Sequence, residues 1–457
     1  MTGARTLAII GGGISGLAAA YFARKLLGPA AEVRVFEASD RPGGKVATLR
    51  TDDFYVELGP DSLVASKPAA IDLAVELGLS EELVSPAPLP AFIYWAGRLH
   101  PIPNPARLRS FGLSGLFSPV GRVRILLDLL LPPRRDEADE SVGAFFARRL
   151  GREVAERYAD PLFAGLYSAD VYGLSLLALF PQYREIEKRY GSLVRGLGAV
   201  RRQAAEAGGL KSIRGGLERL VEALAGRLGP DEVRLRSPVG AVAPAGDGRW
   251  VVQAGGESFA ADAVVLAVPA PAAGKLLATA AQALAGLLGR QELVSVGVIV
   301  FAYRGEPGIS GTGFLVPARA GLLINGATWS SVKWPGSARP GWTVIRAYVG
   351  RAGGPAWWEL TDEELSGRVW AELRRVARLP EKPEVIFIRR WPDALPQYRV
   401  GHPDWAAQVE RELKNLPGLF LTGASYRGVG LADLVRQARE AAGHVAAYLQ
   451  SGRVTAK

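Results

Sequence analysis

Thr6-Leu-Ala-Ile-Ile10, followed directly by Gly11-Gly-Gly-Ile-Ser-Gly16, is the stretch that decides the fold of this 457-residue chain. A short apolar run of this kind is typical of a buried parallel strand. The glycines then lead into an alanine-rich helix, which we expect to end at Gly28-Pro29. Val33-Arg-Val-Phe-Glu37 has the pattern of a second strand, so the segment predicts a strand–helix–strand unit with a right-handed crossover.

The spacing Gly11-x-Gly13-x-x-Gly16 between a strand and a helix is typical of a dinucleotide-binding turn. In such a turn the first glycine makes the sharp bend, the second lets the main chain approach a diphosphate, and the third lets helix and strand pack closely. Glu37 ends the second strand, where a carboxylate can accept hydrogen bonds from ribose hydroxyls. We therefore expect a bound dinucleotide, with a plain glycine-rich turn as the alternative.

Arg41-Pro-Gly-Gly-Lys45 follows this acid directly. Two glycines and a cation suit a second loop that closes over the same diphosphate, although such a stretch alone is equally typical of a solvated turn. Its position after the strand that carries Glu37 favours the first interpretation. A nicotinamide cofactor does not need a second loop of this kind.

The composition excludes several classes of site. The chain has no cysteine and only three histidines, so disulfides, thiolate catalysis and cysteine-ligated metals are excluded, and we expect no metal site. The formal charge of +10 favours anionic partners, but the basic residues do not interleave with aromatic residues, so we expect no nucleic acid. Glycine and proline interrupt the apolar segments, so we also expect no transmembrane helix.

Over nearly its whole length the sequence resembles FAD flavoproteins of the amine-oxidase superfamily, and within them the porphyrinogen oxidase family. Arg41–Lys45 and Glu57-Leu-Gly-Pro-Asp-Ser62 carry the broad resemblance. The narrower resemblance, most of all to bacterial coproporphyrinogen III oxidases that form coproporphyrin III, is carried by Pro161-Leu-Phe-Ala-Gly-Leu-Tyr-Ser-Ala-Asp170, Ala327-Thr-Trp329, Lys333-Trp334-Pro335, Arg346-Ala-Tyr-Val-Gly350, Leu395-Pro-Gln-Tyr398, Gly401-His402 and Thr422-Gly-Ala-Ser-Tyr-Arg-Gly-Val-Gly430.

The resemblance implies that FAD is the cofactor, held without a covalent link. The residues that it implies for FAD binding are Gly11, Gly12, Gly13, Ile14, Ser15, Gly16 and Leu17 at the diphosphate; Glu37 and Ala38 at the ribose; Gly44, Lys45, Gly59, Pro60, Asp61 and Ser62 along the phosphates and flavin; Val239 at the adenine; and Trp391, Gly423, Val429, Gly430 and Leu431 around the flavin ring. For the substrate it implies Lys67, Gly165 and Leu166. No side chain is assigned a catalytic role, because the flavin itself accepts the hydride, and His402 is a candidate by residue type alone.

The implied reaction is the six-electron oxidation of coproporphyrinogen III to coproporphyrin III in haem biosynthesis, in three flavin cycles, with dioxygen as acceptor and hydrogen peroxide as by-product. Oxidation of protoporphyrinogen IX is the alternative, and a flavin amine oxidase or a flavin-binding protein without turnover is more remote. Further expectations are hand-over of product to a ferrochelatase, a cytoplasmic location, and peripheral contact of the arginine-rich stretch from Arg98 to Arg135 with the inner face of the membrane.

The expected fold is mixed α/β, with a Rossmann-like FAD-binding domain, a strand-rich substrate-binding domain and a helical domain of a membrane-facing type. We expect the FAD-binding domain to be discontinuous and to comprise residues 1–66, 210–292 and 412–457. The substrate-binding domain would comprise 67–92, 190–209 and 293–411, and the helical domain 93–189. Within the substrate-binding domain, Thr361-Asp-Glu-Glu predicts a helix that starts with a capping box.

Overall fold

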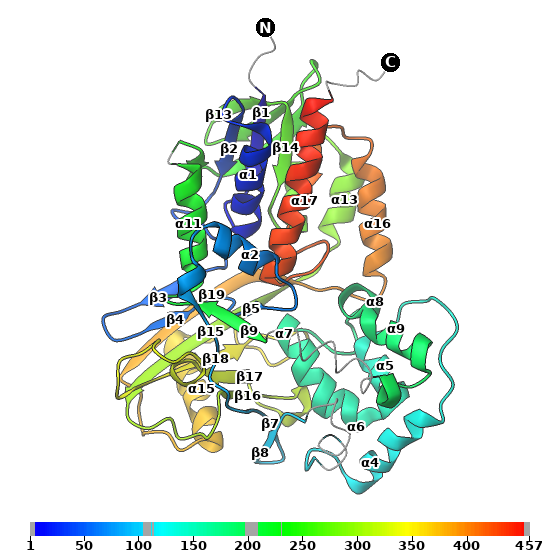
Figure 1. The fold of residues 1–457 in the computed structure, drawn as a ribbon, viewed down its shortest axis with the longest axis vertical. Helices are drawn as coiled ribbons and strands as arrows, with labels where there is room; N and C mark the ends of the chain where they lie inside the picture. Colours follow the sequence, from blue (N-terminus) through cyan, green and yellow to red (C-terminus); the bar gives the residue numbers. More distant parts are fainter. Residues whose placement is uncertain (1–4, 104–110, 112–113, 197–208, 230, 452–457) are drawn as a thin grey trace.

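The computed structural model describes residues 5–103, 111, 114–196, 209–229 and 231–451. Elements from the beginning and the end of the chain lie side by side in the upper part of Figure 1, around helices α1 (Ile14–Leu27) and α17 (Leu431–Gln450). A large sheet and a group of helices occupy the lower part (Figure 1). In the part of the chain that is described, no helix is both long and apolar enough to cross a membrane.

The upper part is built on a parallel sheet whose central strand is β1, the apolar run at the start of the chain. Leu7 of β1 pairs with Val33 on one side and with Ala263 on the other. A strand with neighbours on both edges and layers on both faces is buried along most of its length, which explains the apolar run from Leu7 to Ile10. The strand order is β10 (Val233–Arg234), β2 (Glu32–Phe36), β1 (Thr6–Ile10), β14 (Ala263–Leu266) and β20 (Leu419–Leu421).

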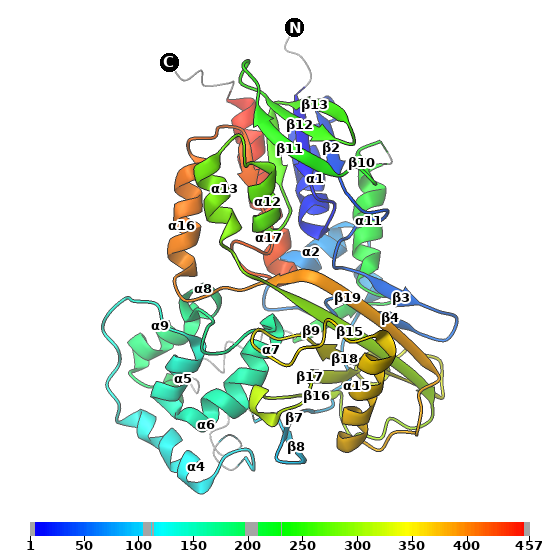
Figure 2. The ribbon, with the colours of Figure 1, turned by 180° about the vertical axis from the view of Figure 1, so that it is seen from behind.

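Helices and an antiparallel meander cover the two faces of the parallel sheet (Figures 1 and 2). On one face, α1 and α17 pack into a single apolar core with α11 (Glu218–Leu228) and α2 (Ala69–Glu76). The core on the other face contains the meander β11 (Val239–Pro244), β12 (Trp250–Ala254) and β13 (Glu257–Ala261), together with α12 (Ala270–Leu276), α13 (Gln282–Gly289) and α16 (His402–Leu413).

A large, mostly antiparallel sheet, here called the mixed sheet, lies below the parallel sheet (Figure 2). Its strand order is β19 (Val385–Pro396), β15 (Leu293–Arg304), β18 (Trp342–Val349), β17 (Ile324–Trp329), β16 (Gly313–Leu315), β7 (Ala91–Trp95) and β8 (Arg98–Pro101). Helix α15 (Asp362–Val376) covers one face, and the predicted capping box between Thr361 and Glu364 is present at its start. The short helix α14 (Ser330–Lys333) follows β17.

Small antiparallel elements fill the space between the two sheets. Strands β3 (Thr48–Arg50) and β4 (Tyr55–Glu57) form one pair. Strand β9 (Leu210–Ile213) pairs with both β5 (Leu63–Val64) and β6 (Leu83–Val84). One-turn 3₁₀ helices occur at Ser80–Glu82 and Ala318–Ala320.

The helical region, residues 114–196, lies beside the mixed sheet (Figure 1). It contains α4 (Pro119–Leu126), a 3₁₀ turn η2 (Leu127–Leu129), α5 (Val142–Leu150), α6 (Arg152–Val154), the π-helical segment η3 (Ala155–Ala164), α7 (Gly165–Tyr167), α8 (Leu176–Leu179) and α9 (Pro181–Tyr190). Its core is apolar and aromatic but also encloses charge. Asp128 and Arg149 are fully buried, and Arg149 Nε donates to Asp128 Oδ1 at 2.6 Å.

The packing differs from the expected domain division at three places. Strand β7 crosses the expected boundary between residues 92 and 93, and β8 continues the same sheet. Helix α2 packs in the core with α1, and α16 packs in the core with α13, although both were expected in the substrate-binding domain. These elements bury their apolar faces against the parallel-sheet layers, which a division drawn along the sequence does not reveal. We propose the expected three domains with these elements reassigned.

Candidate functional site

The first glycine turn leaves an open space at the N-terminus of α1. Ile14, Ser15, Gly16 and Leu17 form the first helical turn, Gly13 is the N-cap, and this turn contains no acidic residue. A Cβ on Gly16 would overlap the carbonyl oxygen of Gly11, so helix and strand require glycine there. A Cβ on Gly13 would meet no atom within 4 Å. The space beside Gly13, at the N-terminus of α1, is therefore open, and a helix N-terminus favours a bound anion.

Glu37 lies against the same turn. Its Oε2 accepts a hydrogen bond from Gly12 N at 2.6 Å, and its Oε1 accepts from Ser39 N at 2.8 Å. Ser237 N donates to the Glu37 carbonyl oxygen at 2.8 Å. This contact brings the segment that leads into Val239, the first residue of β11, next to Glu37 and Ala38.

The second glycine loop meets the first, as its position in the sequence predicts. Gly43 N donates to Gly12 O at 2.8 Å, and a Cβ on Gly44 would lie 3.3 Å from Gly13 Cα. Lys45 follows, and within the described residues it makes no hydrogen bond or ion pair. Burial lowers the pKa of its ammonium group. An unpartnered, partly buried cation beside an open anion site is the arrangement that a bound diphosphate would complete.

Gly59, Pro60, Asp61 and Ser62 run alongside the second loop. A Cβ on Gly59 would overlap the carbonyl oxygen of Lys45, so these two segments touch along their main chains. Trp391, on β19, donates from Nε1 to Leu58 O at 2.6 Å and thereby joins the mixed sheet to this segment. Ser62 Oγ donates to Asp61 Oδ1 at 2.9 Å.

Asp61 is bound by two cations whose role the sequence did not assign. Lys333 Nζ donates to Asp61 Oδ2 at 2.7 Å, and Arg346 Nη1 lies 3.4 Å from the same oxygen. Burial raises the pKa of Asp61, but the two cations outweigh it and hold that pKa at about 2. Arg346 Nη2 also donates to Gly59 O at 2.6 Å. Lys333 and Arg346 belong to motifs of the family resemblance, and these motifs were the available signal.

A second carboxyl lies close to this group. Glu57 is 5% exposed, and burial raises its pKa to about 7, although the hydrogen bond from Leu217 N and the charge of Arg346 act in the opposite direction. Thr48 Oγ1 donates to Glu57 Oε2 at 2.9 Å, and Leu217 N donates to Oε1 at 2.6 Å. Both carboxylate oxygens of Glu57 therefore accept hydrogen bonds from within the chain.

The C-terminal turn closes the site from the opposite end of the chain. A Cβ on Gly423 would lie 3.9 Å from Ser15 Oγ, so this turn passes the start of α1. Gly430 is the N-cap of α17, and Leu431 is its first residue. Val429 lies between Gly428 and this cap. The tyrosine hydroxyl of Tyr398 accepts a hydrogen bond from Gly428 N at 2.8 Å.

The three residues expected at the substrate lie around this turn. Lys67 Nζ donates to both carboxylate oxygens of Asp433, on the first turn of α17, at 2.9 Å. The Lys67 side chain is 58% exposed and that of Asp433 is 16% exposed. Gly165 and Leu166 lie in α7, and Leu166 is 69% exposed. Gln397 Nε2 donates to the carbonyl of the next residue, Tyr167, at 3.1 Å, and so connects α7 to the segment beside Gly428.

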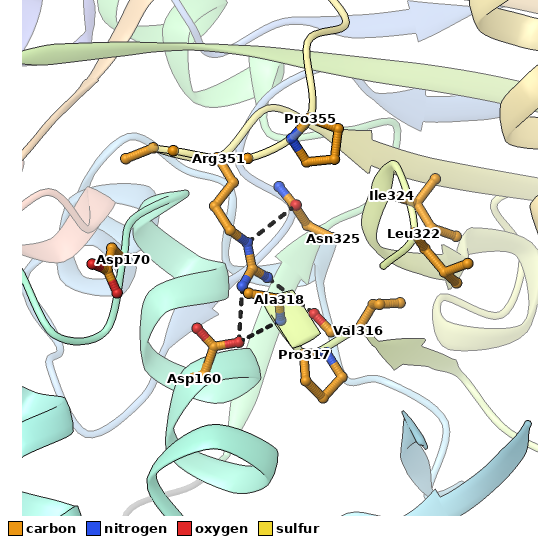
Figure 3. Close-up of a pocket in the computed structure, with 13 residues that line it drawn as sticks. Asp160, Asp170, Val316, Pro317, Ala318, Leu322, Ile324, Asn325, Arg351 and Pro355 are labelled. Carbon is orange, nitrogen blue, oxygen red and sulfur yellow. Dashed lines mark hydrogen bonds and ion pairs between the residues drawn. The ribbon is translucent and has the colours of Figure 1, made fainter. Parts of the chain in front are cut away.

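Figure 3 shows a cavity of about 290 Å³ at the junction of the helical region and the mixed sheet. At its centre Arg351 Nη1 donates to Asp160 Oδ2 at 2.8 Å, and Ala318 N donates to the same oxygen at 2.7 Å. Burial raises the pKa of Asp160, and Arg351 opposes that effect. The residues that line the cavity include none of the expected site residues. We interpret this ion pair as a structural link that fixes η3, and with it α7, against the sheet.

The residues of the two glycine loops fit an FAD diphosphate. The open space at Gly13 and the unpartnered Lys45 are the two observations that support the fit. Buried polar atoms near the same site, Arg346 Nε and Thr422 Oγ1, also have no hydrogen-bond partner among the described residues. The site therefore has unused donors where the sequence places a cofactor.

Comparison with known proteins identifies the family. The model of the family described as flavin containing amine oxidoreductase matches residues 14–446. The chain belongs to this family. It is 33% identical to the coproporphyrinogen III oxidase of Bacillus subtilis (strain 168), covering 98% of this chain and 99% of that one, and 33% identical to that of Staphylococcus aureus (strain NCTC 8325 / PS 47), covering 97% and 100%. A crystal structure from Exiguobacterium sp. 255-15, provisionally assigned as a protoporphyrinogen oxidase, is 35% identical, with a TM-score of 0.88 and coverage of 97% and 99%.

As a flavin-containing amine oxidoreductase, the protein is an FAD-dependent oxidoreductase, and its mixed α/β fold is that of the family. The expected family, fold class and cofactor are therefore confirmed. When bound, FAD accepts a hydride from the substrate and passes the electrons to an acceptor. The chain's own part is to hold the cofactor, orient the substrate beside it, and supply the surrounding charge.

Proposed function

We propose that the protein oxidises coproporphyrinogen III to coproporphyrin III with dioxygen as the acceptor. The observation that carries this choice is the similarity, over nearly the whole length of both chains, to two bacterial relatives of that name. The reaction removes six electrons and six protons from the porphyrinogen. Three dioxygen molecules take them up and leave as three hydrogen peroxide molecules.

We propose that the residues expected at the cofactor act as the resemblance implies. The turn from Gly11 to Leu17 would hold the diphosphate, Lys45 would neutralise part of its charge, and Glu37 would bind the ribose. For this, the Glu37 carboxylate must accept a hydrogen bond from a ribose hydroxyl, either in place of the bond from Gly12 N or in addition to it. Asp61 would stay ionised between Lys333 and Arg346 and leave a net positive charge at the flavin end of the site.

We propose Lys67, Gly165 and Leu166 as the substrate contacts. Coproporphyrinogen III carries four propionates, and each one that leaves bulk water needs a cation or a hydrogen bond. Lys67 already has a carboxylate partner, so a propionate must compete with Asp433 for its ammonium group. The exposed side chain of Leu166 offers apolar surface to the flat tetrapyrrole.

Steady-state kinetics with both porphyrinogens test the choice of substrate. We expect a higher kcat/KM for coproporphyrinogen III than for protoporphyrinogen IX, which carries two propionates. Lys67→Ala should reduce this preference by about 1.5 kcal/mol, the low end for a charged hydrogen bond, because the side chain is exposed. Lys25→Ala is the matched control, since Lys25 also pairs with an acid, Glu76, on the same part of the protein. A clear preference of the wild type for protoporphyrinogen IX would make the alternative substrate the correct one.

Anaerobic mixing separates the more remote alternatives. Coproporphyrinogen III should bleach the bound flavin, and admission of air should restore its colour and release peroxide. Bleaching by amines but not by porphyrinogens would identify an amine oxidase. A flavin that none of these compounds bleaches would indicate a binding protein without turnover.

We further propose peripheral contact with the cytoplasmic face of a membrane through α4 and η2. Val120, Val123 and Leu130 are 79%, 61% and 79% exposed and form an apolar row with Leu126 and Leu127. Most of the described arginines that were expected to contact the membrane bind groups of the protein instead. Arg122 and Arg124 donate to main-chain carbonyls, Arg134 pairs with Asp136, and Arg135 remains exposed; Arg107 and Arg109 lie outside the described residues.

Vesicle co-sedimentation tests the proposed contact. We expect the protein to sediment with neutral phosphatidylcholine vesicles, somewhat more with added anionic lipid, and Leu130→Asp to reduce both. No sedimentation with either vesicle would contradict membrane contact. Hand-over of the product to a ferrochelatase remains a prediction, to be tested by whether that enzyme accelerates release of the porphyrin.

A further inference from the structure

Residues 395–402, here called the junction segment, connect the mixed sheet, the helical region and the C-terminal turn. The segment begins where β19 ends, beside the start of β15. It receives hydrogen bonds from the helical region, because Ser175 N donates to Tyr398 O at 2.8 Å. Gly401 N in turn donates to Asp139 Oδ2 at 2.9 Å. The segment then leads directly into α16 (Figure 2).

Gln397 holds the wall on which the substrate is expected. Its side chain is almost fully buried, at 3% exposure, and its Nε2 donates to Tyr167 O at 3.1 Å and to Leu395 O at 3.3 Å. Both partners are carbonyls, so the amide orientation is determined by its surroundings. Tyr167 directly follows Gly165 and Leu166, so this hydrogen bond positions the end of α7.

Tyr398 holds the wall that borders the flavin. Its hydroxyl donates to Ala424 O at 2.7 Å and accepts from Gly428 N at 2.8 Å, and the side chain is fully buried. Burial raises the pKa of this phenol, so its proton stays in place. The His402 ring stacks on the Tyr398 ring with centroids 3.7 Å apart, and His402 Nε2 lies 2.9 Å from Tyr426 O. The C-terminal turn is therefore fastened to this tyrosine at both ends.

We infer that Gln397 and Tyr398 are positioning residues that couple the two walls of the site, an inference that rests on the proposed function. The walls come from distant parts of the sequence, yet their hydrogen bonds converge on adjacent residues whose Cα atoms are about 3.8 Å apart. A shift of α7 that strains the bond to Gln397 is transmitted to Tyr398, and through its hydroxyl to Gly428. The spacing between substrate and flavin ring is thereby set by one dipeptide.

Two variants of the holoenzyme test this inference. Tyr398→Phe keeps the ring stack but loses both hydroxyl bonds, and we expect the Kd for FAD to rise about tenfold. Gln397→Met keeps the length of the side chain but loses the bonds to α7, and we expect the Kd for coproporphyrin III, measured by fluorescence, to rise about tenfold. Tyr303→Phe is the control, because it removes a buried tyrosine hydroxyl bonded to Glu306 O elsewhere in the mixed sheet.

The effect of each variant on the ligand of the other wall shows whether the two walls are coupled or are each supported separately. Coupling predicts that Gln397→Met also changes the Kd for FAD, and Tyr398→Phe the Kd for the porphyrin, each by about threefold or more. If each variant changes only its own ligand, or if Tyr303→Phe does the same as Tyr398→Phe, the inference is wrong. The FAD measurement needs no porphyrin, so it still tests the inference if the proposed substrate is incorrect. Should Tyr398→Phe fail to fold, Gln397→Met alone carries the crossed test.

Discussion

The two glycine loops and the helical region differ in whether their charged side chains have partners within the chain. In the helical region each buried charge is matched: Asp128 accepts from Arg149, Ser192 and Val194 N, and Glu187 accepts from Arg148 and Arg184. At the glycine loops Lys45 has no partner among the described residues, and the space at Gly13 is open. A network in which every charged group has a partner within the chain supports the fold. A buried charged group without a partner instead indicates a missing ligand.

The same contrast separates two other buried acid–arginine sites, Asp160 with Arg351 and Asp61 with Arg346. Asp160 and Arg351 engage each other and the neighbouring main chain, so their cavity offers little to a ligand. Asp61 has two cations for one carboxylate, which leaves an excess of positive charge. The cavity lies at the first of these sites, whereas the charge balance points to the second.

The largest expected effect comes from breaking the matched network. Asp128→Asn leaves the buried Arg149 with only the more distant carboxylate of Glu187, 3.5 Å away, so we expect the free energy of unfolding to fall by about 3–5 kcal/mol. The Kd for FAD should change less than about twofold, because the network supports the fold only. Urea denaturation and FAD titration measure the two quantities. Glu440→Gln removes an exposed ion pair with Arg436 and should cost at most about 0.5 kcal/mol, so an equal loss in both variants would contradict this account.

Glu57 gives the next largest effect, through pH. Its pKa is about 7 in the folded protein, above the ordinary value of 4.5, so between these values the folded state binds the proton more tightly than the unfolded state. Stability from this group is present below pH 4.5 and is lost as the pH rises to 7, by about 3 kcal/mol in total. Glu57→Gln should flatten this fall in urea denaturation curves measured at several pH values. A variant that keeps the wild-type pH slope would exclude Glu57 as its source.

A substitution at Gly13 should weaken FAD binding without changing the stability of the apoprotein. Gly13→Ala meets no atom within 4 Å and has an ordinary φ of −69°, so the apoprotein should keep its stability. The added methyl group occupies the space for the diphosphate, and we expect FAD to bind at least about tenfold more weakly, or 1.4 kcal/mol. Gly443→Ala, which also meets open space but lies within α17, should instead stabilise the protein by about 0.5–1 kcal/mol without affecting FAD. Unchanged FAD affinity in Gly13→Ala would show that the diphosphate binds elsewhere.

Lys45 should give the smallest effect, with opposite signs in the two forms of the protein. Lys45→Met removes a desolvated charge that has no partner, so we expect the apoprotein to gain about 1 kcal/mol. The holoprotein should lose FAD more readily, because the diphosphate loses its cation. Thermal unfolding with and without FAD measures both. A loss of stability in the apoprotein would show that Lys45 supports the fold rather than the ligand.

The sequence by itself determined the first strand and the glycine turn, because these depend on local sterics. Gly11 adopts a φ of +103° and Gly16 excludes a Cβ, and such requirements can be read from residue types in order. The resemblance of motifs along the chain likewise indicated the family and FAD before any contact was known.

Tertiary structure alone decided which charges meet. Lys333 reaches Asp61 across 272 positions, and Lys67 reaches Asp433 across 366, so no local pattern predicts either pair. The same holds for Gln397 and Tyr398, whose motif was visible but whose bonds to Tyr167 and Gly428 were not. It also holds for β7 and α16, whose apolar faces pack on layers that the expected boundaries assigned elsewhere. Local sequence determines backbone conformation, whereas the partners of buried side chains depend on how distant segments pack together.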